Sequence, residues 1–263
     1  MEKLFVALLF ISLSFSTAHG QLRFKDVAYE SDGESMRGLL VTTGPEAPSG
    51  PPKPTVIMLH DRMGLSPFIK RKAEEVAQMG YTVFIADLYG KDKQPKDTDQ
   101  AIAISRKLKD GARAQLRARN LATYKKLKEI SAVDTNRISV IGYCFGGTAA
   151  LEMGRQGLKL DSIISVHGNL NTTKPKDAGK IKSKLLILHG AVDPIVPPKE
   201  VDAFFNEMNQ ANVDYQFISY ANAVHAFTKK EAGSDPARGA AYNETADKRA
   251  TKAVRSFLQE VYP

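Results

Sequence analysis

The only cysteine of the chain, Cys144, lies in the segment Ile138–Thr148, which reads ISVIGYCFGGT. With Gly142 and Gly146 it forms a G-x-C-x-G pattern between a predicted strand and a predicted helix. This pattern is typical of a nucleophile elbow, a tight turn that lifts a nucleophile above a sheet at the start of a helix. There the helix dipole favours a thiolate, and the Phe145 amide points to where an oxyanion would form. The alternative is a buried core cysteine on an ordinary turn.

Two later residues have the chemistry to activate this thiol. Asp193 follows the apolar run LLILHG, and His225 lies in ANAVHAF, after the last apolar run. Catalytic residues of such α/β sheets follow one another in the order nucleophile, acid, histidine. A thiol needs a base to take its proton, and a carboxylate fixes the tautomer of that base. We therefore predict a catalytic triad of Cys144, His225 and Asp193; the alternative is three unrelated loop residues.

A second oxyanion donor is expected from the loop after the apolar run 54–60. That loop reads HDRMGL, and the backbone amide of Arg62 is the candidate donor. His60, His167 and His189 also end apolar runs. The chain has no H-x-H or H-E-x-x-H spacing and no second cysteine. We therefore expect hydrogen-bonded histidines at the rim of the site, and no metal.

Apolar runs alternate with windows of helical spacing after the Pro-rich segment 44–54. This alternation predicts an α/β fold, a mostly parallel sheet with helices on both faces. Residues 24–29 and 36–42 are expected as antiparallel edge strands, and the charged window 97–130 as one long helical stretch. The Pro-rich segment is too short to separate domains, so we expect a single domain over residues 21–263. Buried strands are expected at 54–60, 81–89, 137–142, 160–168, 183–190 and 213–220.

The first twenty residues, MEKLFVALLFISLSFSTAHG, differ in character from the rest. Lys3 precedes an apolar run from Leu4 to Phe15, and small residues follow up to Gly20. This arrangement predicts a signal peptide over residues 1–20, and hence a periplasmic or secreted protein. The apolar run is short for a membrane span, so no stable membrane insertion is expected after cleavage.

The formal net charge is +8, but the basic residues are spread along the whole chain. Basic clusters such as Lys70-Arg71-Lys72 carry no interleaved aromatic residues. This pattern favours a solvated basic surface, and no nucleic-acid partner is expected. The protein is expected to be a monomer.

The segments HDRMGL, GYTVFIADLYG, IGYCFGGTAALE and LLILHGAVDPIVPP are similar to those of the dienelactone hydrolase family. The resemblance covers nearly all of the chain after the first twenty residues. It implies an α/β-hydrolase fold and a Cys-His-Asp triad, which falls on Cys144, His225 and Asp193. It also implies hydrolysis of a small ester or lactone through an acyl-enzyme, without a cofactor.

The sequence departs from the family pattern at two positions. The family usually has a glutamate that contacts the resting thiol; Asp61 stands there and is the candidate thiol-activating group. The family uses arginines for the substrate carboxylate, whereas Lys229 follows His225 by four residues here. A lysine can attract an anion, but without the planar fork of arginine. Lys229, Tyr89 and His167 are the candidate substrate-binding residues.

Two further interpretations remain open at this point. One is an exported carboxylesterase for larger esters of carbohydrate or polyester, which the size of the pocket distinguishes. The other is a binding or redox-sensing protein on a hydrolase scaffold, since an exposed thiol of low pKa is open to oxidation.

Overall fold

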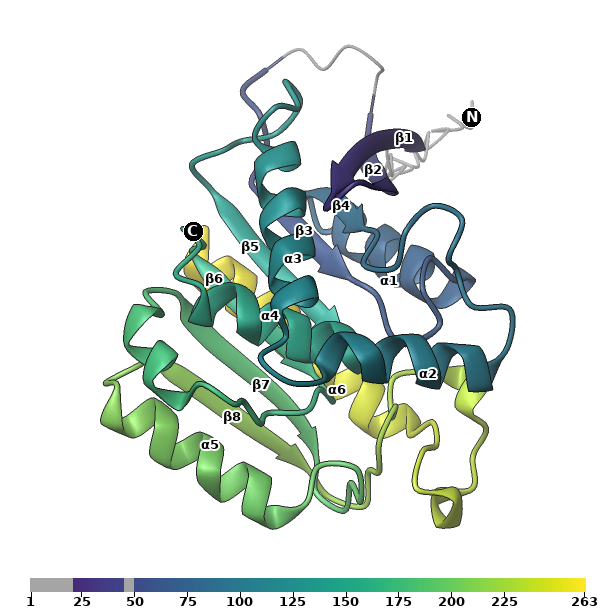
Figure 1. Ribbon diagram of the computed structural model, residues 1–263, viewed down its shortest axis with the longest axis vertical. Coiled ribbons are helices and arrows are strands. Elements are labelled where there is room, and N and C mark those ends of the chain that lie inside the picture. Colours follow the sequence, from purple (N-terminus) through teal and green to yellow (C-terminus); the bar gives the residue numbers. More distant parts are fainter. Residues whose placement is uncertain (1–20, 45–49) are drawn as a thin grey trace, which may run out of the picture.

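The computed structural model describes residues 21–44 and 50–263 (Figure 1). The predicted signal peptide lies outside these described residues, and so does part of the Pro-rich segment.

The central element is an eight-stranded sheet with the order β1-β2-β4-β3-β5-β6-β7-β8. Strands β1 and β2 form an antiparallel hairpin, and β2 pairs antiparallel with β4. All other neighbouring strands are parallel. The predicted α/β class with a mostly parallel sheet is confirmed, and so are the two antiparallel strands at its start, of which only β1 lies at the edge of the sheet. The strands are β1 (Leu22–Ser31), β2 (Glu34–Thr43), β3 (Thr55–Leu59), β4 (Thr82–Ala86), β5 (Ile138–Tyr143), β6 (Ser162–Val166), β7 (Lys184–Gly190) and β8 (Tyr215–Tyr220).

Helices cover both faces of the sheet (Figure 1). In this view α3 (Ala114–Leu127), α4 (Phe145–Arg155) and α5 (Pro198–Gln210) lie in front of the sheet, and α1 (Pro67–Gln78) and α6 (Glu244–Val261) lie behind it. Helix α2 (Thr98–Lys109) lies near the C-terminal ends of the strands. Short 3-10 helices span Pro175–Lys180, Lys230–Ala232 and Pro236–Arg238.

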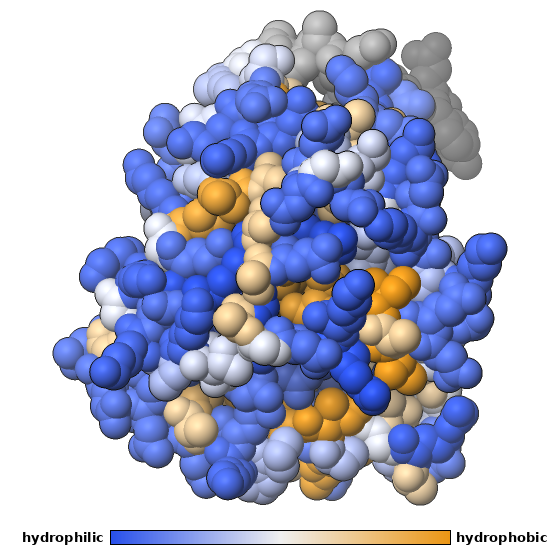
Figure 2. Space-filling model, in the orientation of Figure 1, coloured by the Kyte–Doolittle hydropathy of each residue, from blue (hydrophilic) through white to orange (hydrophobic). Residues whose placement is uncertain are grey.

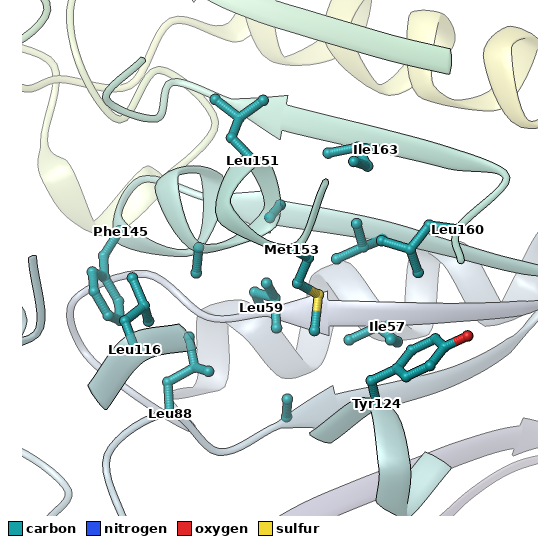
Figure 3. Packing of buried hydrophobic residues seen from close by; sticks show 14 of the residues in the cluster. Ile57, Leu59, Leu88, Leu116, Tyr124, Phe145, Leu151, Met153, Leu160 and Ile163 are labelled. Atoms are coloured by element: carbon teal, nitrogen blue, oxygen red, sulfur yellow. The ribbon is translucent and has the colours of Figure 1, made fainter. Parts of the chain in front are cut away.

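Each face of the sheet has its own hydrophobic core, because alternate residues of a strand point to opposite faces. In β3, Ile57 and Leu59 belong to the cluster under α3 and α4, whereas Val56 and Met58 belong to the cluster under α1 and α6. Figure 3 shows side chains of α4 packing between β3, β6 and α3. This packing fixes α4, the helix whose N-terminus follows the cysteine.

The charged window 97–130 is not one helical stretch, and in this respect the prediction was wrong. Helix α2 ends at Lys109, and α3 begins at Ala114. Between them Gly111 and Arg113 both adopt left-handed conformations, with φ of 54° and 55°. Glycine takes this conformation at little cost. Arg113 is held in it by hydrogen bonds to Glu152 and Asn171.

A buried ion network ties α3, α4 and α5 together at the far end of α4. The Glu152 carboxylate, 1% exposed, pairs with Arg113 at 3.1 Å, Arg117 at 2.8 Å and Arg155 at 3.2 Å. Arg155 also pairs with Glu207 at 2.7 Å. Removing one partner from a buried network leaves charges that neither water nor a counter-ion compensates.

Glu152→Gln is therefore expected to lower the free energy of unfolding by about 3–5 kcal/mol, as measured by urea denaturation. The matched control is Glu129→Gln, whose carboxylate is 65% exposed and pairs with Lys126. A pair that exposed contributes about 0–1 kcal/mol. Equal losses in the two variants would contradict a structural role for the network.

Hydrophilic side chains cover most of the molecular face in Figure 2, with smaller hydrophobic areas between them. None of the helices in the described ranges combines the length and the apolar character that crossing a membrane requires.

Candidate active site

Cys144 forms a sharp turn between β5 and α4. Its φ and ψ are 55° and −115°, and its amide donates to the Val166 carbonyl at 2.9 Å. A Cβ on Gly142 would lie 1.9 Å from the Gly146 carbonyl oxygen, and one on Gly146 would lie 2.2 Å from that of Leu59. Both positions therefore require glycine, as in a nucleophile elbow.

The structure brings Cys144, His225 and Asp193 together in one hydrogen-bonded series. His225 Nε2 lies 3.0 Å from Cys144 Sγ, and His225 Nδ1 lies 2.9 Å from Asp193 Oδ2. Asp193 is fixed in turn, since its Oδ1 accepts from the amides of Ile195 at 2.8 Å and Val196 at 3.3 Å. His225 and Asp193 are buried, whereas Cys144 is partly exposed to the cavity.

The charges of this series favour a thiolate beside an imidazolium. Burial alone raises the pKa of the Cys144 thiol, but the charge and hydrogen bond of His225 outweigh it, so that the pKa lies below its usual value. Burial lowers the pKa of His225, but the thiolate and Asp193 outweigh that and raise it to about 10. Because the two groups interact strongly, the proton is shared by the pair. The arrangement therefore favours the deprotonated form of the thiol, which is its nucleophilic form.

Phe145 and Arg62 carry the two backbone amides that the sequence predicts near the thiol. The amide of Phe145 opens α4, and that of Arg62 lies in the loop after β3. Within the described part of the chain, neither amide donates a hydrogen bond to another residue. Arg62 itself lines the same cavity as Cys144. These are the two candidate oxyanion donors of the sequence.

In the described part of the chain, the Asp61 carboxylate forms no hydrogen bond with the thiol. Its Oδ1 accepts from the Met63 amide at 2.9 Å, and its Oδ2 forms an ion pair with Lys229. The shorter aspartate thus stabilises its own turn and binds the lysine instead of reaching Cys144. The negative charge of Asp61 acts against the thiolate, in that it raises the pKa of Cys144. Lys229, in turn, is already paired.

Tyr89 is not among the residues that line the cavity. Its side chain is fully buried, and its hydroxyl donates to the Arg62 carbonyl at 3.0 Å. His167 does line the cavity, with its ring edge against His225 at a centroid distance of 5.2 Å. Its Nε2 is bonded to Thr228 Oγ1 at 2.9 Å. Burial and the charge of His225 hold the pKa of His167 well below its usual value, so His167 is neutral.

The cavity above the thiol has a volume of about 400 Å³. Besides the predicted residues its lining includes Thr98 of α2 and Arg238 of the last 3-10 helix, which the sequence did not single out. Arg238 follows His225 by thirteen residues, and nothing in its spacing marked it as cavity-lining. In the described ranges, no group of three or more His, Cys, Asp or Glu side chains is arranged to hold a metal ion.

A larger hollow of about 810 Å³ lies at the opposite end of the sheet. It is lined by residues that precede the parallel strands, such as Pro54, Asp161 and Lys182, and by the chain end at Pro263. It contains neither a histidine nor the cysteine, so the smaller cavity is the candidate site.

A sheet of this order, with a cysteine on the turn after its fifth strand and the acid and histidine on later loops, defines an α/β-hydrolase. The model of the dienelactone hydrolase family matches residues 39–262. The chain therefore belongs to the dienelactone hydrolase family and is a hydrolase.

Relatives agree with this assignment over most of the chain. The structure named m3DLH has 33% identity and a TM-score of 0.86, covering 93% of this chain and 100% of that one. A dienelactone hydrolase-like promiscuous phosphotriesterase, P91, from metagenomic libraries has 32% identity and a TM-score of 0.85, with the same coverage. A protein of Saccharolobus solfataricus named "Putative carboxymethylenebutenolidase" is 26% identical over 274 residues, which is 90% of this chain and 98% of that protein.

Proposed function

We propose that this protein hydrolyses a small ester or lactone, with Cys144 as nucleophile, His225 as acid and base, and Asp193 as the residue that orients His225. The observation that carries the proposal is the hydrogen-bonded series of these three side chains at the base of a cavity. The family membership supports the reaction class.

The reaction proceeds in two halves. The Cys144 thiolate attacks the carbonyl carbon, and the amides of Arg62 and Phe145 hold the oxyanion. When the adduct collapses, the carbon–oxygen bond to the alcohol breaks, and imidazolium His225 gives its proton to the leaving oxygen. A thioester remains. Neutral His225 then takes a proton from water, which attacks the thioester and releases the acid and the thiolate.

The size of the cavity favours a small substrate over a polymer. Cavities of roughly 300–1,000 Å³ hold small molecules, and the volume here, about 400 Å³, lies near the lower limit. This supports a small ester or lactone over the larger carbohydrate or polyester substrates.

Cavity charge supports a substrate that carries an anionic group. Arg62 and Arg238 line the cavity, and in the described part of the chain neither guanidinium forms an ion pair. The two carboxylates of the lining are compensated, since Asp61 pairs with Lys229 and Glu231 with Arg71. Two uncompensated guanidinium groups favour a carboxylate near the scissile bond, which they can bind by charge-assisted hydrogen bonds.

Arg238→Gln is expected to lower kcat/KM about tenfold for mono-p-nitrophenyl glutarate, which carries a carboxylate, since one charge-assisted bond contributes roughly 1.5–3 kcal/mol when fully formed. The variant should change kcat/KM less than twofold for neutral p-nitrophenyl pentanoate. Initial rates with both esters give kcat/KM for the variant and the wild type, and hence the ratio of the two losses. Equal effects on the two esters would contradict the anionic substrate class.

Alkylation of the single cysteine tests both the proposed hydrolysis and the alternative redox-sensing interpretation. Treatment with iodoacetamide until no free thiol remains is expected to abolish hydrolysis of p-nitrophenyl pentanoate. Full activity after complete alkylation would exclude Cys144 as nucleophile. A protein with a reactive thiol but no ester hydrolysis would favour the redox-sensing interpretation.

We further propose that residues 1–20 direct export to the periplasm or the medium. Support comes from the apolar run and the small residues that follow it. N-terminal sequencing of the exported protein tests this, with a start near Gln21 expected.

A further inference from the structure

We propose that the buried pair of His60 and Tyr89 positions the oxyanion hole, holding the Arg62 amide in place without touching the substrate. The inference rests on the proposed function, which gives the amides of Arg62 and Phe145 that role. Both members of the pair are fully buried, and their rings meet edge to face with centroids 4.7 Å apart.

His60 helps to hold the peptide that carries the Arg62 amide. The Leu88 amide can only donate, so His60 Nε2 accepts from it at 3.1 Å and the proton lies on Nδ1. His60 Nδ1 then donates to the Asp61 carbonyl at 2.7 Å, and the Gly64 amide donates to the same carbonyl at 3.1 Å. That carbonyl belongs to the same trans peptide as the Arg62 amide, and the two groups of a trans peptide point in opposite directions. Fixing the carbonyl therefore fixes the direction of the amide.

Tyr89 contacts both residues that supply the oxyanion donors. Its hydroxyl donates to the Arg62 carbonyl at 3.0 Å, which fixes the next peptide of the loop. Its ring stacks on Phe145 with a centroid distance of 5.5 Å and an interplanar angle of 26°. The Tyr89 backbone is anchored by Asp87, whose Oδ1 accepts from the Tyr89 amide at 2.8 Å. The Tyr89 side chain thus contacts both the loop after β3 and the start of α4.

Direction matters here because an oxyanion donor acts only when it points to where the negative charge develops. Loss of one such donor lowers kcat by about 10²–10³. A donor that is present but whose direction is not fixed should lower kcat by a part of that factor. The loss should fall on kcat and spare KM, because the ground-state carbonyl interacts weakly with the hole.

Tyr89→Phe removes only the hydroxyl and tests this assignment. We expect kcat for p-nitrophenyl pentanoate to fall about tenfold with KM unchanged, a fraction of the loss for a deleted donor. Binding of 1,1,1-trifluoro-2-hexanone, whose adduct with the thiolate is an oxyanion, should weaken by the same factor. The rate of Cys144 alkylation by iodoacetamide should stay unchanged, since that displacement uses no oxyanion hole.

Tyr124→Phe is the matched control. Tyr124 is also a buried tyrosine whose hydroxyl donates to a backbone carbonyl, that of Lys159 at 3.2 Å, but it lies on α3, outside the cavity lining. It should show a similar small loss of thermal stability with kcat unchanged, which separates positioning from a general structural effect.

His60 is tested with a pair of variants. Glutamine can still donate to the Asp61 carbonyl and accept from the Leu88 amide, so His60→Gln should keep kcat within about threefold. Leucine can do neither. Because the Gly64 amide still donates to the Asp61 carbonyl, His60→Leu should lower kcat by a part of the loss for a missing donor, about tenfold.

The outcomes separate this inference from the proposed function. An active wild-type enzyme with Tyr89→Phe and His60→Leu both within twofold of it in kcat overturns the positioning role alone. A wild-type protein that neither hydrolyses the ester nor binds the ketone overturns the proposed function and this inference with it. If the Tyr89 and His60 variants change alkylation as much as kcat, the pair is merely structural.

Discussion

Replacing Cys144 with alanine is expected to lower kcat for ester hydrolysis by about 10⁴-fold or more. No other thiol exists in the chain, and Cys144 is the member of the hydrogen-bonded series that lies on the turn before α4 and lines the cavity. The residual rate would come from the oxyanion donors and from binding alone. Steady-state rates with p-nitrophenyl pentanoate, after thiol titration has confirmed the substitution, provide the measurement.

The fold should survive this substitution, because alanine keeps the Cβ and the site is partly exposed. Binding of an unreactive substrate analogue by the variant, measured by calorimetry, shows whether the cavity is intact. If the alanine variant retains more than a tenth of the wild-type kcat, another group attacks the carbonyl and the assignment of Cys144 fails.

Asp193→Asn is expected to lower kcat by roughly 10³–10⁴-fold while leaving the fold intact. The reason is geometric. The Ile195 and Val196 amides demand an acceptor at the Oδ1 position, so the asparagine must place its oxygen there. Its amino group then faces His225 Nδ1 and forces the imidazole proton onto Nε2, the nitrogen that must serve Cys144.

The same substitution should change how the thiol titrates. Without the carboxylate the pKa of His225 falls from its raised value of about 10, and the stabilising imidazolium is lost from the thiol. The pKa of Cys144, which His225 lowers, should therefore rise. In wild-type protein the alkylation rate should be high at pH 7; in Asp193→Asn it should increase only as the pH rises toward that of an ordinary thiol, about 8.5.

Asp202→Asn is the control for this variant, since Asp202 is an exposed aspartate of α5 that does not line the cavity. It makes the same chemical change and should keep kcat within twofold. If Asp193→Asn also keeps kcat within tenfold, Asp193 is not the orienting acid.

The large-scale order of the fold was predictable because each parallel strand is an apolar run between turns. β3, for example, is buried at all five positions. The elbow was predictable for a steric reason, in that glycine is the only residue whose backbone fits beside the Gly146 and Leu59 carbonyls. The positions of Asp193 and His225 followed from the rule that loops at the C-terminal ends of parallel strands meet at one edge.

The sequence alone did not predict which side chains contact one another in the site. Asp61 could be placed near the thiol. That its carboxylate pairs with Lys229 and not with Cys144 depends on a side chain one methylene group shorter than glutamate, and on the turn in which the Met63 amide donates to it. Tyr89 was expected to bind substrate. The depth to which its ring is buried, against Phe145, is a property of packing that periodicity does not encode.

The central claim is that Cys144 carries the acyl group during turnover. Acid quenching of wild-type enzyme within milliseconds of mixing with p-nitrophenyl pentanoate, followed by mass spectrometry of the intact protein and its peptides, tests it directly. We predict one pentanoyl group on the peptide that contains Cys144, released by neutral hydroxylamine as a thioester and lost when turnover is allowed to finish. An acyl group on any other residue, or active enzyme with rate-limiting deacylation and no acyl group on Cys144, would contradict the account.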